Sequence, residues 1–442
     1  MTRGSVRSHV VRMMLFILTG LAFQTLYALV DIYWVGRLGK QAVAAVTLSS
    51  NLMFVSLALT QMLSVGCVAL VSQAAGRKEH DRVQYLFNQA QSLSSCAGLV
   101  FLGLGWALRD VYAERLAGDA ATAALAKSFL TTFLPALALQ FTMVGLGSAL
   151  RGIGDMRPGF IAQTASVLLN MVLAPFLIFG WLSGHPLGVG GAALATLLST
   201  VAAVAGLILY LRRGKTFLKV SLSAWRPDWQ LWRQMVGIGL PAGAEFLVMS
   251  VIIGVVYAVT RPFGAQAQAG FGIGSRVMQA GFMPAVAISF SAAAVVGQNF
   301  GAGAFGRVRE VLRESVKLAV AFMVAFIVLC QVAPSALMKL FSSEPAVVDA
   351  GTDYLRTVSY NYVASGLVFA FAGIFQGLGN TWPSLAASLS RAVVFVFPVL
   401  WLSSQPGFDL HTIWLFSVLT VTLQCVVSGL FLRRELKVRA PC

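Results

Sequence analysis

The sequence predicts an all-α polytopic membrane protein, with twelve transmembrane helices in two six-helix lobes related by a pseudo-twofold axis along the membrane normal. Composition is the first observation: of 442 residues, 58% are hydrophobic and 11% are charged, whereas soluble domains carry about 25% charged residues. The mean hydropathy is +0.80. The other two observations are twelve apolar stretches of bilayer-spanning length and an internal repeat. Together they exclude a soluble globular protein.

Each predicted span is a mostly apolar stretch of at least about 20 residues. Glycine, proline and charged residues mark the breaks between spans. We keep the first stretch as a span rather than a cleaved signal peptide, because it is long, lacks a convincing small-x-small cleavage site and runs on into Asp31. The twelve spans are 12–35, 43–71, 88–108, 129–150, 159–181, 188–211, 235–260, 267–296, 314–336, 352–375, 383–403 and 411–432.

The basic residues predict the orientation of these spans. With a cytoplasmic N-terminus, 21 of the 32 Lys and Arg residues fall on the cytoplasmic side and 8 on the other side. Because cytoplasmic loops carry the excess of positive charge, both termini are expected in the cytoplasm of a protein that crosses the inner (plasma) membrane many times. The net charge of +16 is therefore interpreted as orientation, and no nucleic-acid partner is expected.

The two halves of the sequence repeat at a spacing of 225 residues, without a gap over about 120 residues. Six spans in each half is an even number, so both halves insert in the same sense and the repeat is parallel. The predicted domains are an N-terminal lobe (1–211), a basic cytoplasmic linker (212–234) and a C-terminal lobe (235–442). Matching pairs include Gly39 and Gly264, Gln73 and Gln298, Gly154 and Gly379.

Several short motifs resemble those of the multidrug and toxic compound extrusion (MATE) family. The first span closes with Asp31-Ile-Tyr-Trp-Val-Gly-Arg-Leu-Gly39. Further motifs are Gln73-Ala-Ala-Gly76, Arg151-Gly-x-Gly-Asp155, Gly239-Leu-Pro241 and Gln298-x-x-Gly301. Each motif is weak alone, but the set follows the family's order and spacing across both halves. The resemblance implies a bacterial-type multidrug/cation antiporter.

Asp31 is one of only two carboxylates well inside the predicted spans. A charge near the bilayer centre costs at least about 2.5–3.5 kcal/mol, so it needs a reason. Asp31 shares a helical face with Gln24 and Tyr27, which makes a polar stripe that should face a cavity. The family resemblance implies a cation-coupling role for Asp31; the alternative is a structural carboxylate near the outer interface.

Glu245 is the second intramembrane carboxylate, expected near the midplane about 15 Å into the seventh span. Pro241 precedes it by four residues and frees a backbone carbonyl in the preceding turn. A carboxylate beside a carbonyl suits transient Na⁺ binding, whereas a desolvated carboxylate suits proton carriage. The resemblance implies coupling or substrate binding at Glu245; the alternative is a helix-packing hydrogen bond.

The fifth span departs from the family pattern. It carries Asn170, but Ala174 stands where many relatives have an aspartate, and Thr196 in the sixth span is a plausible polar neighbour of Asn170. The tenth span, which contains Tyr360 and Asn361, has no carboxylate near its centre. We therefore favour protons over Na⁺ as the coupling ion.

Further cavity candidates lie in the second half. Arg276, Gln279 and Met283 share one face of the eighth span, and Arg391 lies in the eleventh. Either arginine could pair with a carboxylate across a cleft, and Arg276 could instead extend to the interface.

These patterns predict secondary active efflux of organic, cationic or amphipathic compounds in exchange for H⁺ or Na⁺. The alternative is a flippase for lipid-linked precursors or polysaccharide, which would need more basic residues in its cleft. The sequence has no Walker A, HExxH or GxSxG motif, so we expect no enzyme, cofactor or resident metal. The expected partners are small-molecule substrates and the lipid bilayer, and the protein is expected to be a monomer.

Overall fold

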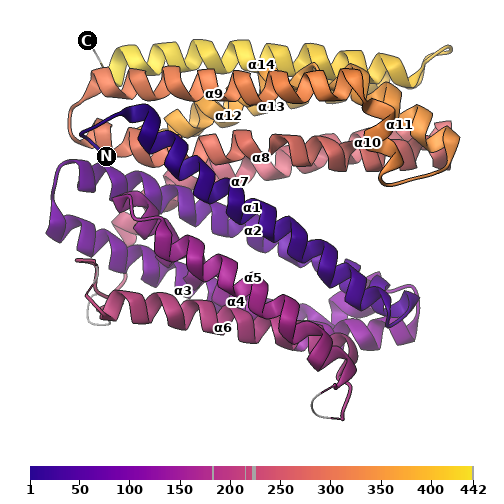
Figure 1. Cartoon of the computed structure of the whole chain (residues 1–442), viewed down its shortest axis with the longest axis horizontal. Coiled ribbons are helices and arrows are strands. Elements are labelled where there is room, and N and C mark those ends of the chain that lie inside the picture. Colours follow the sequence, from indigo (N-terminus) through magenta and orange to yellow (C-terminus); the bar gives the residue numbers. More distant parts are fainter. Residues whose placement is uncertain (182–183, 215, 222–224, 441–442) are drawn as a thin grey trace. The chain divides into compact units, whose positions relative to one another are not determined.

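The computed structural model describes residues 1–181, 184–214, 216–221 and 225–440, apart from the side chains of Tyr27 and Ala28. These described residues form fourteen α-helices and a 3-10 helix, with no strand among them (Figure 1). Twelve of the helices are long and apolar enough to cross a membrane. The predicted fold class is therefore confirmed.

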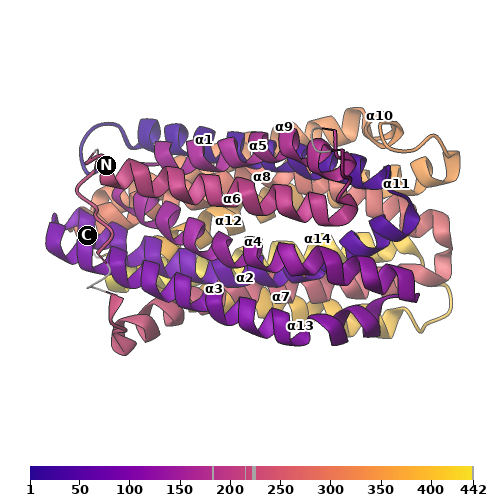
Figure 2. The same ribbon diagram turned by 90° about the horizontal axis from the view of Figure 1, so that it is seen from below.

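Six helices form the first half of the chain. They are α1 (Val6–Gly36), α2 (Lys40–Gly76), α3 (His80–Leu116), α4 (Ala120–Ile153), α5 (Arg157–Phe179) and α6 (Gly188–Arg212). Helices α5 and α6 lie side by side (Figure 1, Figure 2), as do α2 with α4 and α3 with α4.

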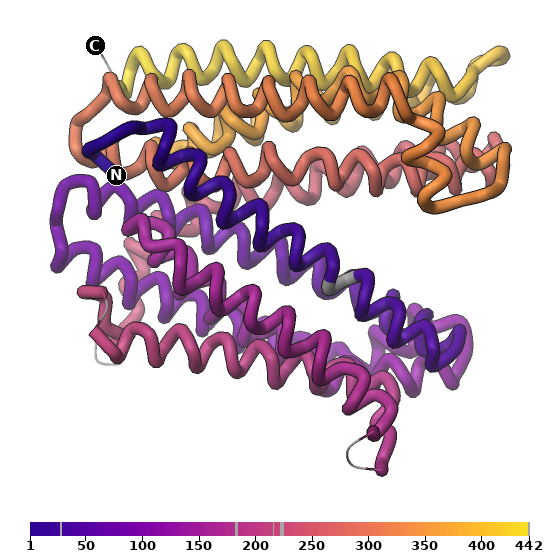
Figure 3. Tube along the Cα trace, viewed as in Figure 1, coloured from indigo at the N-terminus to yellow at the C-terminus, as the bar shows by residue number. Residues whose placement is uncertain are grey.

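The second half has the same order with two interruptions. Its elements are α7 (Trp229–Thr260), η2 (Arg261–Phe263), α8 (Ala265–Gly301), α9 (Phe305–Val332), α10 (Pro334–Lys339), α11 (Pro345–Val358), α12 (Asn361–Leu378), α13 (Trp382–Leu402) and α14 (Leu410–Arg439). The chain leaves α9, passes through α10 and returns along α11 (orange in Figure 3).

The helix boundaries repeat at the spacing found in the sequence. Helix α8 begins and ends 225 residues after α2 begins and ends. Helix α9 likewise begins 225 residues after the start of α3. Helix α4 corresponds in the same way to the whole stretch from the start of α11 to the end of α12. The two halves therefore share one backbone design.

The prediction of single helices at 314–336 and 352–375 was wrong. The first stretch breaks at Ala333, just before Pro334, and the second breaks between α11 and α12. At the second break the carbonyl of Arg356 accepts from Gln331 Nε2 at 2.7 Å and from Ser359 Oγ at 3.0 Å. These side chains satisfy a carbonyl that would otherwise accept from the next turn, which permits the helix to stop.

The loops after α4 and α12 close in the same way. Gly154 and Gly379 both have a left-handed backbone, with φ of 93° and 74°, and each ends its helix with the paired backbone hydrogen bonds of a Schellman motif. The residue after each glycine hydrogen-bonds a side chain on the last helix of the same half, α6 or α14. Tyr210 donates to Asp155 at 2.8 Å, and Asn380 donates to Glu435 at 2.8 Å.

The chain divides into two compact units. The N-terminal unit is residues 16–240, and the C-terminal unit is residues 1–15 with 241–442. The two cuts, at 16 and 241, again have the separation of the repeat, and they fall within α1 and α7. The predicted lobe limits around the 212–234 linker stay a prediction.

The start of α7 packs within the N-terminal unit. Gly66 on α2 and Gly239 on α7 permit this close approach, because a side chain at either position would collide with the backbone of Met235 or Met62. The start of α1 packs within the C-terminal unit in the corresponding manner. There Arg307 Nη2 donates to the carbonyls of Met1 and Gly4 at 3.1 and 3.0 Å.

Polar side chains of α3 hold the linker that precedes α7. Gln89 accepts from the backbone N–H of Asp228 and from Trp232 Nε1, and it donates to the carbonyl of Arg226 at 2.8 Å. Ser92 donates to the carbonyl of Trp225 at 3.0 Å. Gln84 accepts from the backbone N–H of Lys219 and Tyr85 donates to Asp228, which explains why α3 begins at His80, eight residues before its predicted apolar span.

Replacing Gln89 with leucine is expected to lower thermal stability markedly. The variant leaves three linker groups without this partner, of which the buried Trp232 Nε1 alone costs about 1–3 kcal/mol. Ser92→Ala removes one hydrogen bond and should lower the melting temperature less. Fluorescence-detected size exclusion after heating measures both variants, and an equal effect would contradict this account of the linker.

Asp228, which lies just before α7, makes a pH-dependent contribution to the stability of the fold. Its pKa lies below the ordinary 3.8, chiefly because the backbone N–H of Leu231 donates to its carboxylate, with the Tyr85 hydroxyl as a second donor. A depressed pKa stabilises the fold above the ordinary value and stops doing so as the pH falls through the depressed value. The melting-temperature difference between wild type and Asp228→Ala should therefore be full at pH 7 and narrow below about pH 4. For Tyr85→Phe, the melting-temperature difference from wild type should narrow less over the same pH range.

Candidate functional site

Asp31 lies near the end of α1 with its carboxyl group turned inward. The side chain is half-buried, and its Oδ1 atom is fully buried with no hydrogen-bond partner among the described residues. Leaving a buried polar group unpaired costs about 1–3 kcal/mol, and more for a charge. Such a group is retained where it has a task, which supports the functional reading over the structural one.

Contacts between α1 and α5 place Asp31 about one turn beyond the depth of Asn170. The Phe16 and Phe160 rings lie 5.4 Å apart, and the Trp34 and Phe179 rings lie 6.0 Å apart further along both helices. Both helices have an odd place in the order of spans, so they run in the same direction. Asp31 is thus close to the level of Ala174, where the expected second carboxylate is missing.

The expected neighbourhood of Asn170 and Thr196 is present. Asn170 Nδ2 donates to Thr196 Oγ1 at 3.0 Å, and Thr196 Oγ1 donates in turn to the carbonyl of Ala192 at 3.1 Å. Asn170 is buried, yet its Oδ1 atom has no partner within the described part of the chain. This oxygen is an unused acceptor inside the N-terminal unit.

The other members of the predicted α1 stripe are less informative. Gln24 is exposed on the N-terminal unit. The side chain of Tyr27 lies outside the described residues. Of the two stripe side chains that the structure describes, only Asp31 is buried in part.

Glu245 pairs with a residue that the sequence analysis did not identify. The hydroxyl of Ser384, on α13, hydrogen-bonds its carboxyl group. Ser384 is the third residue of α13, whereas Glu245 lies at the centre of α7, which begins at Trp229 and ends at Thr260. The expected midplane depth of Glu245 stays a prediction.

Arg391 lies near the middle of α13 and contacts α14. Its Nη1 atom donates to Gln424 Oε1 at 3.5 Å, and Gln424 Nε2 donates to Ser388 Oγ at 3.0 Å. The Nε atom of Arg391 is fully buried and has no partner among the described residues. In the described part of the chain, no carboxylate lies within 4.0 Å of this guanidinium group.

The remaining candidates fall into two groups. Arg276 and Gln279 are exposed on α8 and Met283 is half-buried, so this stripe lies on the surface of the C-terminal unit. Tyr360 is 58% exposed at the break between α11 and α12. Asn361 is buried, donates from Nδ2 to Ser417 Oγ at 3.0 Å, and keeps an unpaired Oδ1.

The sequence analysis missed the partners of these groups. Ser384 and Ser388 share a face of α13 with Arg391, at positions i, i+4 and i+7. Ser417 and Gln424 are likewise seven residues apart on α14. Polar stripes at helical spacing inside apolar spans were the available signal for both sets.

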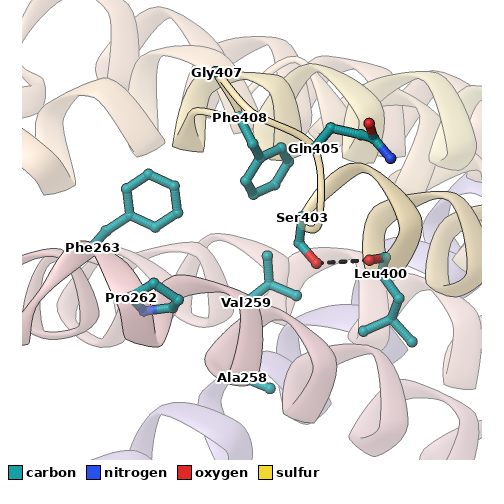
Figure 4. A pocket seen from close by; sticks show the side chains of 9 residues that line it. All are labelled: Ala258, Val259, Pro262, Phe263, Leu400, Ser403, Gln405, Gly407 and Phe408. Atoms are coloured by element: carbon teal, nitrogen blue, oxygen red, sulfur yellow. Dashed lines mark hydrogen bonds between the residues drawn. The ribbon is translucent and has the colours of Figure 1, made fainter.

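One hollow of the C-terminal unit is separate from these groups. A cavity of about 390 Å³ lies between the end of α7 and the α13–α14 loop of the C-terminal unit (Figure 4). Its lining is mostly apolar and carries no charged side chain; it comprises Ala258, Val259, Pro262, Phe263, Leu400, Ser403, Gln405, Gly407 and Phe408. None of the predicted site residues lines it.

Known proteins resemble this chain over nearly its whole length. The family model described as MatE matches residues 17–176 and 241–402, which are the two halves of the repeat. The chain belongs to the MatE family. As a member of this transporter family it is a membrane transporter, which confirms the expectation that it is not an enzyme.

Curated relatives of this MatE chain are bacterial. It is 26% identical over 397 residues to the probable multidrug resistance protein YoeA of Bacillus subtilis, covering 88% of this chain and 86% of that protein. It is 24% identical over 419 residues to the multidrug export protein MepA of Staphylococcus aureus, covering 93% and 90%.

Solved structures agree on the fold. One is described as an outward-facing conformation of a multidrug resistance MATE family transporter, and it matches with a TM-score of 0.91 at 22% identity over 99% of this chain and 98% of that chain. A MATE structure in the bent conformation matches with a TM-score of 0.92 at 23% identity over 99% and 97%. At these identities the likeness establishes the fold.

Thr196→Val is expected to destabilise the N-terminal unit. The variant keeps the shape of the side chain but removes the hydroxyl that accepts from Asn170 Nδ2. Asn170 Nδ2 and Oδ1 then both have no partner among the described residues, at a cost of about 1–3 kcal/mol. Thr200→Val is the matched control one turn along α6, because Thr200 Oγ1 bonds only the backbone carbonyl of Thr196. Equal melting temperatures for the two variants in detergent would contradict this role of Thr196.

Proposed function

We propose that this MatE transporter exports organic, cationic or amphipathic compounds in exchange for H⁺ or Na⁺, with H⁺ favoured. The observation that carries the proposal is the buried, unpaired carboxylate oxygen of Asp31 in a chain of this family. MepA is named a multidrug export protein, and YoeA a probable multidrug resistance protein. Both relatives cover nearly all of this chain.

Asp31 and Glu245 supply the two charges that a cation can neutralise. Asp31 belongs to the N-terminal unit and Glu245 to the C-terminal unit. Their surroundings differ, because Glu245 has the Ser384 hydroxyl as a donor whereas Asp31 Oδ1 has none among the described residues. Neutralisation of either carboxylate relieves a desolvation cost.

A proton fits these surroundings better than Na⁺. A single carboxyl group is sufficient to carry a proton, whereas Na⁺ is held by several oxygen ligands. Near the depth of Asp31, α5 offers Ala174 rather than a second carboxylate. In the described residues no group of three or more His, Cys, Asp or Glu side chains comes together.

Neutralisation of a carboxylate would drive export by changing the balance between two conformations. A ligand shifts such a balance only by its difference in affinity for the two states, and cation and drug must affect each other reciprocally. Moving one charge inward through 100 mV supplies about 2.3 kcal/mol. One unit of pH gradient adds about 1.4 kcal/mol per proton. For a substrate without net charge the two terms together correspond to a several-hundred-fold outward gradient, whereas exchange of one monocation for one proton moves no net charge and keeps only the pH term, about tenfold.

The membrane orientation is part of the same proposal. Both termini lie at one end of the C-terminal unit, where Arg307 bonds Met1 and Arg309 Nη2 donates to the carbonyl of Ala440 at 2.9 Å. We assign this end to the cytoplasm, because the majority of the basic residues fall on that side. The proposed location is the inner membrane, and the proposed state is a monomer.

Asp31→Asn and Glu245→Gln are each expected to reduce dye efflux from proteoliposomes at least tenfold. Each variant removes a charge that the coupling cation would neutralise, while the shape of the side chain is kept. Efflux is followed by fluorescence under an imposed pH gradient and, separately, an imposed Na⁺ gradient. Wild type should respond to the pH gradient.

Glu114→Gln is the matched control, because Glu114 is an exposed carboxylate of α3 paired with Lys127. It should keep wild-type efflux. Full activity in both Asp31→Asn and Glu245→Gln would remove the coupling assignment. Efflux driven by Na⁺ alone would replace H⁺ with Na⁺ as the coupling ion.

A further inference from the structure

We propose that the hollow between the end of α7 and the α13–α14 loop binds one anionic phospholipid, with an acyl chain inside the hollow and the phosphate group at Arg261. The lipid comes from the leaflet at the predicted outer face, because α7 starts at the predicted cytoplasmic linker and ends beside the hollow. Such a site serves contact with the bilayer and is separate from the coupling carboxylates.

Aromatic side chains fill the corresponding place in the N-terminal unit. The rings of Trp34, Phe179 and Trp181 pack together at the ends of α1 and α5, with ring centroids 5.7 to 6.0 Å apart. Tyr33 packs against Trp34 with ring centroids 5.0 Å apart, and its hydroxyl accepts from Arg37 Nη2 at 2.7 Å. These four aromatic residues, called the aromatic cluster below, close that end of the N-terminal unit with the protein's own side chains.

The C-terminal unit has small residues at all four positions of the aromatic cluster. At the spacing of the repeat, the corresponding residues are Ala258, Val259, Ser404 and Pro406. Helix α13 begins 225 residues after α5, so the two helix pairs are built alike. Ala258 and Val259 line the hollow, which measures about 390 Å³ and falls within the about 300–1,000 Å³ of small-molecule pockets. The loss of four large rings therefore leaves space of ligand size.

The lining of the hollow suits a hydrocarbon chain. The rings of Phe263 and Phe408, with centroids 6.0 Å apart, form two of its sides (Figure 4). No charged side chain lines it, and Ser403 Oγ already donates to the carbonyl of Leu400 at 2.8 Å. The Gln405 amide turns away from both rings (Figure 4). An unfilled space forfeits van der Waals contacts along its walls, and an acyl chain restores them without having to supply a polar group.

The hollow lies at the level expected for the boundary between headgroups and hydrocarbon. Tyr257 and Trp401, each next to a lining residue, are exposed within the last turn of α7 and of α13. Tyrosine and tryptophan are enriched at this boundary. Deeper along the same helices, Ile253 and Phe397 are exposed and apolar. An acyl chain can thus reach the hollow along apolar surface from the bilayer.

Arg261 supplies a positive charge at the rim of the hollow. It directly precedes the lining residue Pro262, and its side chain is exposed. In the part of the chain that the structure describes, Arg261 forms no ion pair, whereas Arg37 at the corresponding end of α1 is held by Tyr33. A guanidinium group binds phosphate oxygens through parallel N–H donors. The rim is therefore suited to a lipid phosphate.

The acidic residue nearest to the hollow in the sequence is engaged elsewhere. Asp409 follows the lining residue Phe408, but its carboxylate accepts from the backbone N–H of Thr412 at 2.9 Å and so caps the start of α14. An anion near a helix N-terminus is stabilised by the helix dipole. The charge of Arg261 thus remains available for an anionic headgroup.

Ala258→Tyr is expected to weaken the binding of phosphatidylglycerol at least tenfold. The variant gives the C-terminal unit the residue that the N-terminal unit has at the matching position, so a tyrosine ring occupies the space of the acyl chain. Native mass spectrometry of the full chain in detergent, titrated with palmitoyl-oleoyl phosphatidylglycerol, measures the dissociation constant of the tightest lipid site. Ala386→Tyr, at an exposed position near the other end of α13, is the matched control and should bind as wild type does.

Arg261→Gln tests the headgroup contact by comparison of two lipids with the same chains. Binding of phosphatidylglycerol should weaken about fivefold, which is the loss expected for one basic residue near anionic lipid. Binding of palmitoyl-oleoyl phosphatidylcholine should change less than twofold. Lys339→Gln, at an exposed position of α10 on the same predicted outer side, should leave the binding of both lipids unchanged.

Melting temperatures in detergent separate a lost lipid site from a misfolded variant. Added phosphatidylglycerol should raise the melting temperature of wild type and of Ala386→Tyr, but not that of Ala258→Tyr. Equal lipid binding by wild type and Ala258→Tyr, or no lipid retained by wild type, would overturn the proposal. Unchanged lipid binding in Ala258→Tyr with a raised KM for an exported dye would assign the hollow to a drug, which would overturn it too. An equal loss of both lipids in Arg261→Gln would overturn the phosphate contact.

Discussion

The cost of placing an unpaired polar group inside the membrane is the constraint on which the rest of this structure depends. Serine and threonine hydroxyls on the spans mostly return to a carbonyl of their own helix, as Thr200 does to Thr196. Buried amides pair across helices, as Asn170 does with Thr196 and Asn361 with Ser417. Against this background, Asp31 Oδ1 and Arg391 Nε are exceptions, because they are buried without a hydrogen-bond partner among the described residues.

The duplicated backbone carries different chemistry in its two halves. Helix boundaries, the Schellman loops and the cuts between units all follow the spacing of the repeat, but the charged groups do not. The position equivalent to Asp31 is Val256, and the position equivalent to Glu245 is Gly20. The backbone repeat preserves packing, since it depends on small and apolar residues at matching positions. The charged site residues differ between the halves, because the packing of the repeat does not depend on them.

This division suggests separate tasks for the two units. The N-terminal unit offers one carboxylate with a buried oxygen and a neighbouring Asn170 acceptor, which suits neutralisation by a small cation. The C-terminal unit offers the Glu245 carboxylate on α7, which Ser384 of α13 hydrogen-bonds, and the Arg391 guanidinium group further along α13. Coupling between such sites is a difference in free energy between conformations, and it acts in both directions.

The sequence by itself determined the class, the number of spans, the repeat and the family, because these depend on apolar length and on motifs along the chain. It also indicated Asp31, Glu245 and Arg391, since charges are conspicuous in apolar spans. The partners Ser384, Ser388 and Gln424 emerged only from the tertiary structure, because the periodicity of one helix does not reveal which helix lies opposite. The break between α11 and α12 was decided there too, by Gln331 reaching the carbonyl of Arg356 from another helix.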